Sequence, residues 1–294
     1  MKPSNFKWTA AFAVWFFATV AIVAANLYYS IPSDETIKGC FIARMHQIEI
    51  CPKSPRYVPI SHINSFLKDA ILVSEDTGFF HHNGFELEEL KESLRVNLAR
   101  GAFARGGSTI SQQLARNLFL NSEKSILRKV KEAIITYRLE AVLSKNEILE
   151  RYLNVVEFGK DIYGIGAAAQ HYFKKAPSDL SLLESTYLAF LLPSPVKYSS
   201  SYYKGQLTKF TAKRIHQILF RMQSYQRISG EEYEMAKSMV KYFPWKDTDT
   251  SIVAGSLADQ AAEEALSQGD EAEYTDEELG VDLTSPLGDE PEEI

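Results

Sequence analysis

Two carboxylates, two imidazoles and two aromatic rings lie close together in the segment from Glu75 to Gly84. The segment follows the apolar run from Ala70 to Val73, which is typical of the last turns of a buried helix. Apolar surroundings raise the pKa of a carboxyl group and make it a usable general base near neutral pH. A Glu-Asp pair at a helix end is more often structural, so the pair alone leaves both roles open.

A second group of polar residues begins at Gly106 and Gly107. The first turn of a helix presents free N–H groups and the positive end of the helix dipole, which together bind anions. The pattern therefore favours a cradle for a diphosphate, although an ordinary capped helix with a polar face has the same composition. The neutral donors and the one cation of this group are Ser108, Thr109, Ser111, Gln112, Gln113 and Arg116.

A third group consists of Arg128, Lys129 and Glu132. Arg128 and Glu132 are four residues apart, so on a helix they share one face. An exposed pair of this kind is usually a surface ion pair that contributes little to stability. Next to a diphosphate, the same two cations would instead stabilise negative charge.

The elements that must position these groups are helices. Apolar residues recur at helical spacing from Ile60 onward, and three capping boxes mark the starts of helices at Thr109, Ser144 and Ser181. We find no run of alternating strands, no internal repeat and no Gly-rich nucleotide loop. The sequence predicts a mainly α-helical core over residues 60–245, with helices near 86–100, 109–118, 125–143, 144–153, 181–192 and 206–227.

The N-terminus predicts the compartment. Residues 8–25 form an apolar run whose only polar members are Thr9 and Thr19, and an extension to residue 27 reaches the length of a spanning helix. Lysines precede the run and acidic residues follow it, which places the N-terminus in the cytoplasm and the rest outside. A cleaved signal peptide is the alternative, since Val23-Ala24-Ala25 resembles a cleavage site.

The remaining segments differ in composition from the core. Residues 1–29 are expected to be a cytoplasmic stub and anchor. Residues 30–59, with four prolines, are expected to be an extracytoplasmic tether with one short hairpin. Cys40 and Cys51 lie in this tether, where a disulfide is allowed but two free thiols are the alternative. Residues 246–294 are expected to be an acidic, disordered tail.

Charge is unevenly distributed along the chain. Of the 38 acidic residues sixteen lie between Asp247 and Ile294, a stretch without Lys or Arg, which leaves 32 basic against 22 acidic residues elsewhere. A basic body suits an anionic membrane surface or a phosphorylated substrate, although a generic solvated surface has the same charge. The tail is a passive end, or it repels the anionic membrane or masks the basic body.

Taken in order, the groups resemble the five motifs of glycosyltransferase family 51, the peptidoglycan polymerases. The resemblance covers about 120 residues, and the absence of a later penicillin-binding domain resembles the monofunctional branch, the biosynthetic peptidoglycan transglycosylases. Ser111 stands where the family usually has Thr, and Arg116 where it usually has Lys. The matching segments are Glu75-Asp76-x-x-Phe79-x-x-His82-x-Gly84, Gly107 to Leu114, Arg128-Lys129-x-x-Glu132, Lys145-x-x-Ile148-Leu149-Glu150-x-Tyr152-Leu153-Asn154, and Gly166 to Lys175 continuing through Leu180 to Leu192.

The resemblance implies a lysozyme-like helical fold and the substrate lipid II, which is joined to the growing glycan strand through a β-1,4 bond with release of polyprenyl diphosphate. Glu75 matches the general base and Glu132 the second essential glutamate, which orients the cations or binds a metal. The residues expected to bind substrate or shape its site are Asp76, Phe79, His82, Ser108, Thr109, Gln112, Gln113, Arg116, Arg128 and Lys129.

The same resemblance implies partners and a location. We expect a single-pass protein of the bacterial inner membrane with a periplasmic catalytic domain, in contact with membrane lipids and other cell-wall synthases. A mobile apolar lip is expected around residues 94–106. A divalent cation, Mg or Mn, is expected to assist, whereas we expect no organic cofactor and no nucleic-acid partner.

Two other functions remain open at this point. A lytic enzyme on a related fold would cut glycan strands, but it needs a protonated acid for a sugar leaving group and has no use for a cationic diphosphate cradle. An inactive scaffold that recruits cell-wall proteins is the second alternative, and the presence of both matched glutamates counts against it.

Overall fold

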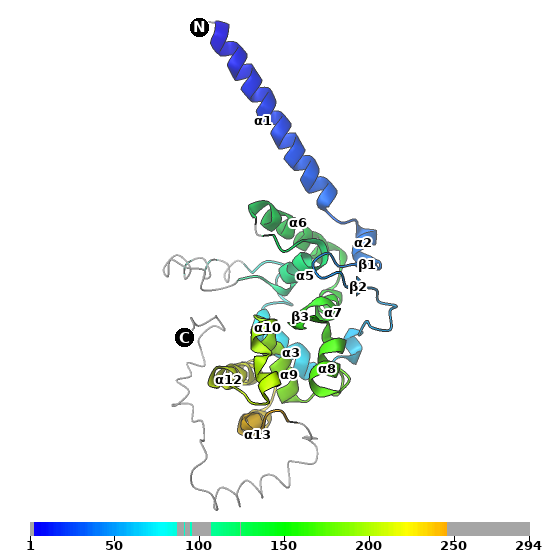
Figure 1. Cartoon of the computed structure of the whole chain (residues 1–294), viewed down its shortest axis with the longest axis vertical. Helices are drawn as coiled ribbons and strands as arrows, with labels where there is room; N and C mark the ends of the chain where they lie inside the picture. The colour runs from blue at the N-terminus through cyan, green and yellow to red at the C-terminus, as the bar shows by residue number, and fades with distance from the viewer. Residues whose placement is uncertain (1–2, 87–90, 92–94, 96–106, 124, 246–294) are drawn as a thin grey trace, which may run out of the picture.

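The computed structural model describes residues 3–86, 91, 95, 107–123 and 125–245 (Figure 1). Most of the expected lip and the whole acidic tail lie outside the described residues. No helix within the described part has both the length and the apolarity of a membrane span.

The described chain is mainly helical, as the periodicity predicts. The elements run in the order α1 (Pro3–Ser30), α2 (Asp34–Lys38), β1 (Phe41–Ile42), β2 (Glu49–Ile50), η1 (Ile60–His62), α3 (Ser65–Glu75), α5 (Ile110–Phe119), α6 (Ile126–Val142), α7 (Lys145–Val155), β3 (Glu157–Gly159), β4 (Ile162–Tyr163), α8 (Ile165–Phe173), α9 (Leu182–Leu191), α10 (Pro195–Tyr198), α11 (Ser200–Lys204), α12 (Lys209–Ser224), α13 (Gly230–Met239) and η2 (Val240–Tyr242).

The three predicted capping boxes are confirmed, whereas most of the helix expected near 86–100 lies outside the described residues. Thr109, Ser144 and Ser181 each cap a helix, and each capping box is complete with its Gln or Glu three residues later. A fourth capping box, Ser229 with Glu232, opens α13, which the periodicity did not predict. The four described strands form two short antiparallel hairpins, β1 with β2 and β3 with β4.

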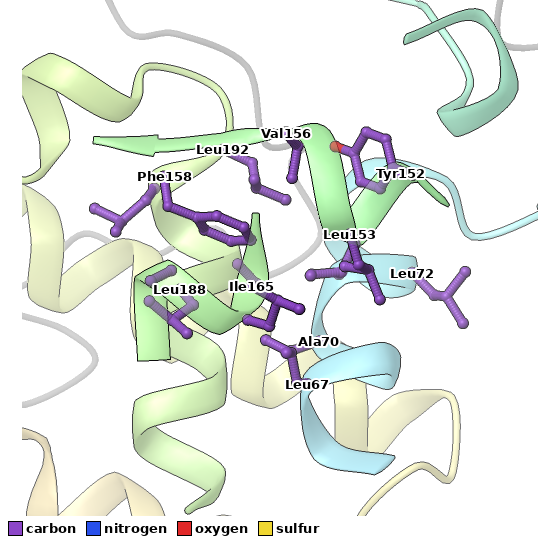
Figure 2. Close-up of a cluster of buried hydrophobic side chains, with 14 of the residues drawn as sticks. Leu67, Ala70, Leu72, Tyr152, Leu153, Val156, Phe158, Ile165, Leu188 and Leu192 are labelled. Carbon is purple, nitrogen blue, oxygen red and sulfur yellow. The ribbon is translucent and has the colours of Figure 1, made fainter. Parts of the chain in front are cut away.

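The core forms where α3, α7, α8 and α9 meet (Figure 2). Leu67 and Ala70 of α3 are completely buried, and they lie in one cluster with Leu153 of α7, Ile165 of α8 and Leu188 of α9. Burying a leucine or isoleucine side chain contributes about 1.5–3 kcal/mol to folding. The cluster therefore fixes the direction in which α3 ends. The end of α3 is Glu75.

Residues 30–59 are more than a tether, because several of their side chains belong to the core. Ile37, Ala43 and Ile50 are almost fully buried. The backbone N–H of Arg44 donates to the carbonyl of Leu118 at 2.8 Å, which attaches the first hairpin to the end of α5. Cys40 and Cys51 are joined by a disulfide that closes this hairpin.

Candidate active site

Glu75 is held by α5 and α7 together. Gln113 of α5 donates from Nε2 to Glu75 Oε2 at 2.8 Å, and the hydroxyl of Tyr152 on α7 donates to Gln113 Oε1 at 3.2 Å. The tyrosine therefore orients the amide, and the amide orients the carboxylate. Tyr152 is completely buried and was not among the predicted site residues. Its hydroxyl on an otherwise apolar helix face is the sequence signal that could have identified it.

The environment of Glu75 raises its pKa. Although the residue keeps some exposed surface, its carboxyl group is surrounded by protein, and this desolvation is the largest effect and disfavours the charged form. The hydrogen bond from Gln113 opposes it, the charge of Asp76 adds to it, and the charge of Arg116 opposes it. A carboxylate with a raised pKa is a stronger proton acceptor once ionised, as a general base requires.

Asp76 and His82 hold the loop after α3 against the start of α5. Buried Asp76 accepts from the backbone N–H of Ile110 at 2.8 Å through Oδ2, and its Oδ1 lies 2.9 Å from His82 Nε2. The backbone N–H of Gly84 donates to His82 Nδ1 at 3.0 Å, so the ring proton belongs on Nε2, facing Asp76. The polar atoms of both residues are engaged within the protein, which makes them positioning residues.

Three other predicted residues also serve the local structure. Thr109 donates from Oγ1 to the carbonyl of Gly84 at 2.7 Å, and Gln112 Oε1 accepts from the Thr109 N–H at 3.0 Å in the capping box. Phe79 is completely buried, and Lys145 Nζ lies 4.6 Å from its ring centroid. These contacts place the first two motifs against each other without offering the same atoms to a ligand.

Gly84 makes this close approach possible. Its φ of 86° lies in the left-handed region, and a Cβ at this position would come within 2.8 Å of Thr136 Cγ2. Any other residue would be both strained and in collision with α6. The loop that ends the first motif therefore depends on glycine to reach α5 and α6.

Glu132 binds both cations of the third motif. Its side chain is 1% exposed; Arg128 Nη1 lies 3.0 Å from Oε2, and Lys129 Nζ contacts Oε1. The lysine side chain is half exposed and the arginine largely buried. Because both oxygens of Glu132 are occupied by cations, this residue fixes two positive charges beside each other.

Ser108 connects the two halves of the site. Lys129 Nζ lies 3.5 Å from Ser108 Oγ, and the Ser108 carbonyl lies 3.5 Å from Gln113 Nε2. A continuous series of contacts thus runs from Glu75 through Gln113, Ser108 and Lys129 to Glu132. Arg116 follows Gln113 on α5 and is close enough to influence the pKa of Glu75. The structure therefore brings a base and three cations together.

A further polar cluster supports α5 from behind and was not predicted. Ser111 Oγ donates to Glu140 Oε1 at 2.5 Å, and Lys145 Nζ lies 2.7 Å from the same oxygen. The motif alignment gave no reason to single out Glu140. Its carboxylate ties α5, α6 and α7 together beneath the site.

Asp76, His82 and Glu86 are the one group of three or more possible metal ligands in the described residues whose ligand atoms all lie within 4.8 Å of one another. Both oxygens of Asp76 and both nitrogens of His82 already take part in hydrogen bonds that position the site. A cation there would displace the ring proton that faces Asp76. These residues do not fit a resident divalent cation.

Comparison with known proteins identifies the chain's relatives. The family model described as Transglycosylase matches residues 43–223, more than half of the chain. A protein named biosynthetic peptidoglycan transglycosylase from Paraburkholderia xenovorans is 45% identical over 162 residues, which cover 54% of this chain and 68% of the relative. A protein of the same name from Ralstonia nicotianae is 40% identical over 204 residues, covering 65% of this chain and 87% of the relative.

The matched range includes the first hairpin from Ala43 onward and every contact from Glu75 to Glu132 described above. It also extends through α8 and through α9 and nearly all of α12, and the last two helices pack against α3. The chain belongs to the transglycosylase family.

Proposed function

We propose that the chain is a peptidoglycan glycosyltransferase that polymerises lipid II into β-1,4 glycan strands and releases polyprenyl diphosphate. Family membership and the names of the relatives support this reaction. The observation that carries the proposal is the continuous contact series from Glu75 to Glu132, because it joins a base to fixed positive charges.

The base acts on a sugar hydroxyl. The 4-hydroxyl of the acceptor sugar is too weak an acid to ionise near pH 7, so Glu75 takes its proton as the oxygen attacks the anomeric carbon of the donor. Burial raises the pKa of Glu75 and so strengthens it as a base. The bond that forms joins oxygen O4 to the donor's anomeric carbon, and attack from the face opposite the α-linked diphosphate gives a β bond.

The cations act on the leaving group. As the anomeric carbon–oxygen bond breaks, its electron pair leaves with the diphosphate, and Arg116, Arg128 and Lys129 stabilise that charge. Preorganised charges of this kind commonly contribute a factor of about 10²–10³ each to the rate. Glu132 touches both Arg128 and Lys129, so its role in this proposal is to hold them in place.

A divalent cation remains a proposal without a defined site in the described residues. The candidate ligands Asp76 and His82 form a hydrogen bond with one another, and both carboxylate oxygens of Glu132 form ion pairs with Arg128 and Lys129. Bound Mg or Mn would supply further positive charge to the diphosphate. The steps proposed above use the side chains of the protein itself.

We further propose that residues 8–27 anchor the chain in the inner membrane, with the enzymatic domain on the periplasmic side. The apolar sequence of this segment supports the anchor, as do the exposed side chains of Phe12, Trp15 and Phe17 on α1. An anchor would keep the site beside a lipid substrate and raise its effective concentration. Membrane lipids and other cell-wall synthases are the proposed partners, and the lysozyme-like relationship of the fold remains an expectation.

A polymerisation assay tests the proposed reaction against the alternatives. The full-length chain in lipid vesicles is incubated with fluorescent lipid II, and in parallel with purified glycan strands. Polymer formation from lipid II supports the proposal. Shortening of the strands without polymer formation would identify a lytic enzyme, and the absence of both reactions in a folded protein would favour a scaffold.

A further inference from the structure

A small pocket lies beside Glu75, on the elements that support the end of α3. It is partly open and has a volume of about 40 Å³. Helices α3, α9, α10 and α12 contribute to it, and these elements lie together in the lower half of the molecule (Figure 1). The lining residues are Ser74, Glu75, Ala189, Phe190, Pro193, Tyr198, Arg214 and Ile218.

The walls combine an apolar surface with two hydrogen-bonding groups. Ala189 and Ile218 are buried and apolar, whereas Arg214 and Tyr198 add a guanidinium and a phenol. Arg214 is only 9% exposed, and its Nη1 donates to Gln217 Oε1 at 3.1 Å. A guanidinium has five N–H donors in a fixed plane, so it is able to hold Gln217 and also to donate to a carbonyl group.

Arg214 and the Glu75 carboxylate serve different parts of a bound group. The Glu75 carboxylate accepts a hydrogen bond from Gln113, whereas the Arg214 guanidinium donates to Gln217. Each group thus has a polar partner of its own, although both residues line one pocket. Two substituents of a single sugar ring would satisfy this arrangement, one at each residue.

The size and chemistry of the pocket fit an acetamido group. One water requires roughly 10–15 Å³ on the same scale of volume, so the pocket admits about three or four non-hydrogen atoms. An acetamido group has four. Its methyl group would contact Ala189 and Ile218, and its carbonyl oxygen would accept from Arg214 or Tyr198.

We propose that this pocket binds the N-acetyl group of the amino sugar whose 4-hydroxyl is delivered to Glu75. The inference rests on the proposed function and deepens it, since it makes Ile218, Ala189 and Arg214 determinants of acyl specificity. These residues lie outside the cationic groups of α5 and α6. The pocket orients the acceptor sugar, whereas the cations bind the diphosphate of the donor.

A change of acyl group tests the proposal. Wild-type protein is assayed with lipid II and with an analogue that has an N-propanoyl group in place of the terminal N-acetyl group. A pocket of this size discriminates one extra methylene by about 10–200-fold in kcat/KM. Ile218→Val removes one methylene from the wall, and we expect it to bring the ratio of kcat/KM for lipid II to kcat/KM for the analogue below about threefold.

Leu219→Val is the matched control, because it removes one methylene from the neighbouring buried residue of α12, which does not line the pocket. We expect it to keep the wild-type ratio. Ala189→Gly enlarges the opposite wall and gives a second relaxed variant if Ile218→Val folds poorly.

Arg214→Lys gives an independent measure, and we expect a raised KM for lipid II with a smaller change in kcat. Equal kcat/KM values for lipid II and the N-propanoyl analogue in the wild-type protein would overturn the inference. The same conclusion would follow if Ile218→Val and Leu219→Val lowered the ratio of these two kcat/KM values equally. Either result could occur with normal polymerisation of lipid II, so it would leave the proposed function intact. A folded wild-type protein that fails to polymerise lipid II would instead remove the proposed function.

Discussion

The replacement of Glu132 by Gln tests how the site holds its positive charges. Gln keeps the shape of the side chain but offers one acceptor oxygen, while its NH₂ group faces the second cation as a donor. Because Glu132 is 1% exposed and bonds both Arg128 and Lys129, one of these contacts must be lost. The residue should therefore affect both stability and rate.

The expected magnitudes follow from the burial of the three side chains. Breaking a fully buried ion pair destabilises a protein by about 3–5 kcal/mol, whereas an exposed pair contributes about 0–1 kcal/mol. Lys129 is half exposed and Arg128 is 18% exposed, so we expect Glu132→Gln to lower the free energy of unfolding by roughly 1–3 kcal/mol. Misplacing the cations should lower kcat by a factor of about 10²–10³.

The assay is continuous polymerisation of fluorescent lipid II across a pH series, combined with urea unfolding. Asp34→Asn is the control, because it breaks the exposed contact of Asp34 with Arg138, and it should leave both quantities nearly unchanged. Since Glu132 positions cations and takes no proton, the acid limb of the Glu132→Gln rate profile should stay where it is in the wild-type protein. A shifted acid limb, or a kcat close to wild type, would refute this reasoning.

Three further changes have defined outcomes. In Gln113→Met, loss of the hydrogen bond that favours ionised Glu75 should raise its pKa further, so the acid limb of kcat/KM moves to higher pH in the polymerisation assay. Asp76→Asn keeps at best one of the two hydrogen bonds that Asp76 forms, with His82 and with the Ile110 N–H. It should lower the free energy of unfolding by about 1–3 kcal/mol in urea titrations. Replacement of both Cys40 and Cys51 by Ser should lower that free energy by up to about 3 kcal/mol, which thermal or urea unfolding measures. An unchanged pH profile or unchanged unfolding midpoints would contradict the respective assignment.

The helices and their starts were predictable because their signals are local. The capping boxes at Thr109, Ser144 and Ser181 need only residues three positions apart, and each is present. The prolines of residues 30–59 predicted a tether with one short hairpin, but they did not place its strands, because strands of two residues are too short to show alternation. Its attachment to α5 depends on a backbone hydrogen bond between Arg44 and Leu118, which lie 74 positions apart in the sequence.

The site residues were predictable by type, whereas their partners were not. The family resemblance singled out Asp76, His82 and Thr109 as residues that shape the substrate site, and the structure uses their polar atoms to join the first two motifs. A sequence shows that an acceptor is present but not that the N–H of Ile110, 34 residues away, fills it. The pocket beside Glu75 was missed for the same reason, since Arg214 belongs to a helix far along the chain.

Proton transfer to Glu75 is the central claim, and the polymerisation rate of Glu75→Gln under single-turnover conditions tests it most directly. General-base catalysis contributes about 10²–10⁴ to a rate, so we expect a loss of that size with little change in unfolding free energy or in binding of lipid II. Glu234→Gln, at an exposed position of α13, should retain the wild-type rate. A folded Glu75→Gln protein that polymerises lipid II within a few-fold of the wild-type rate would contradict the account.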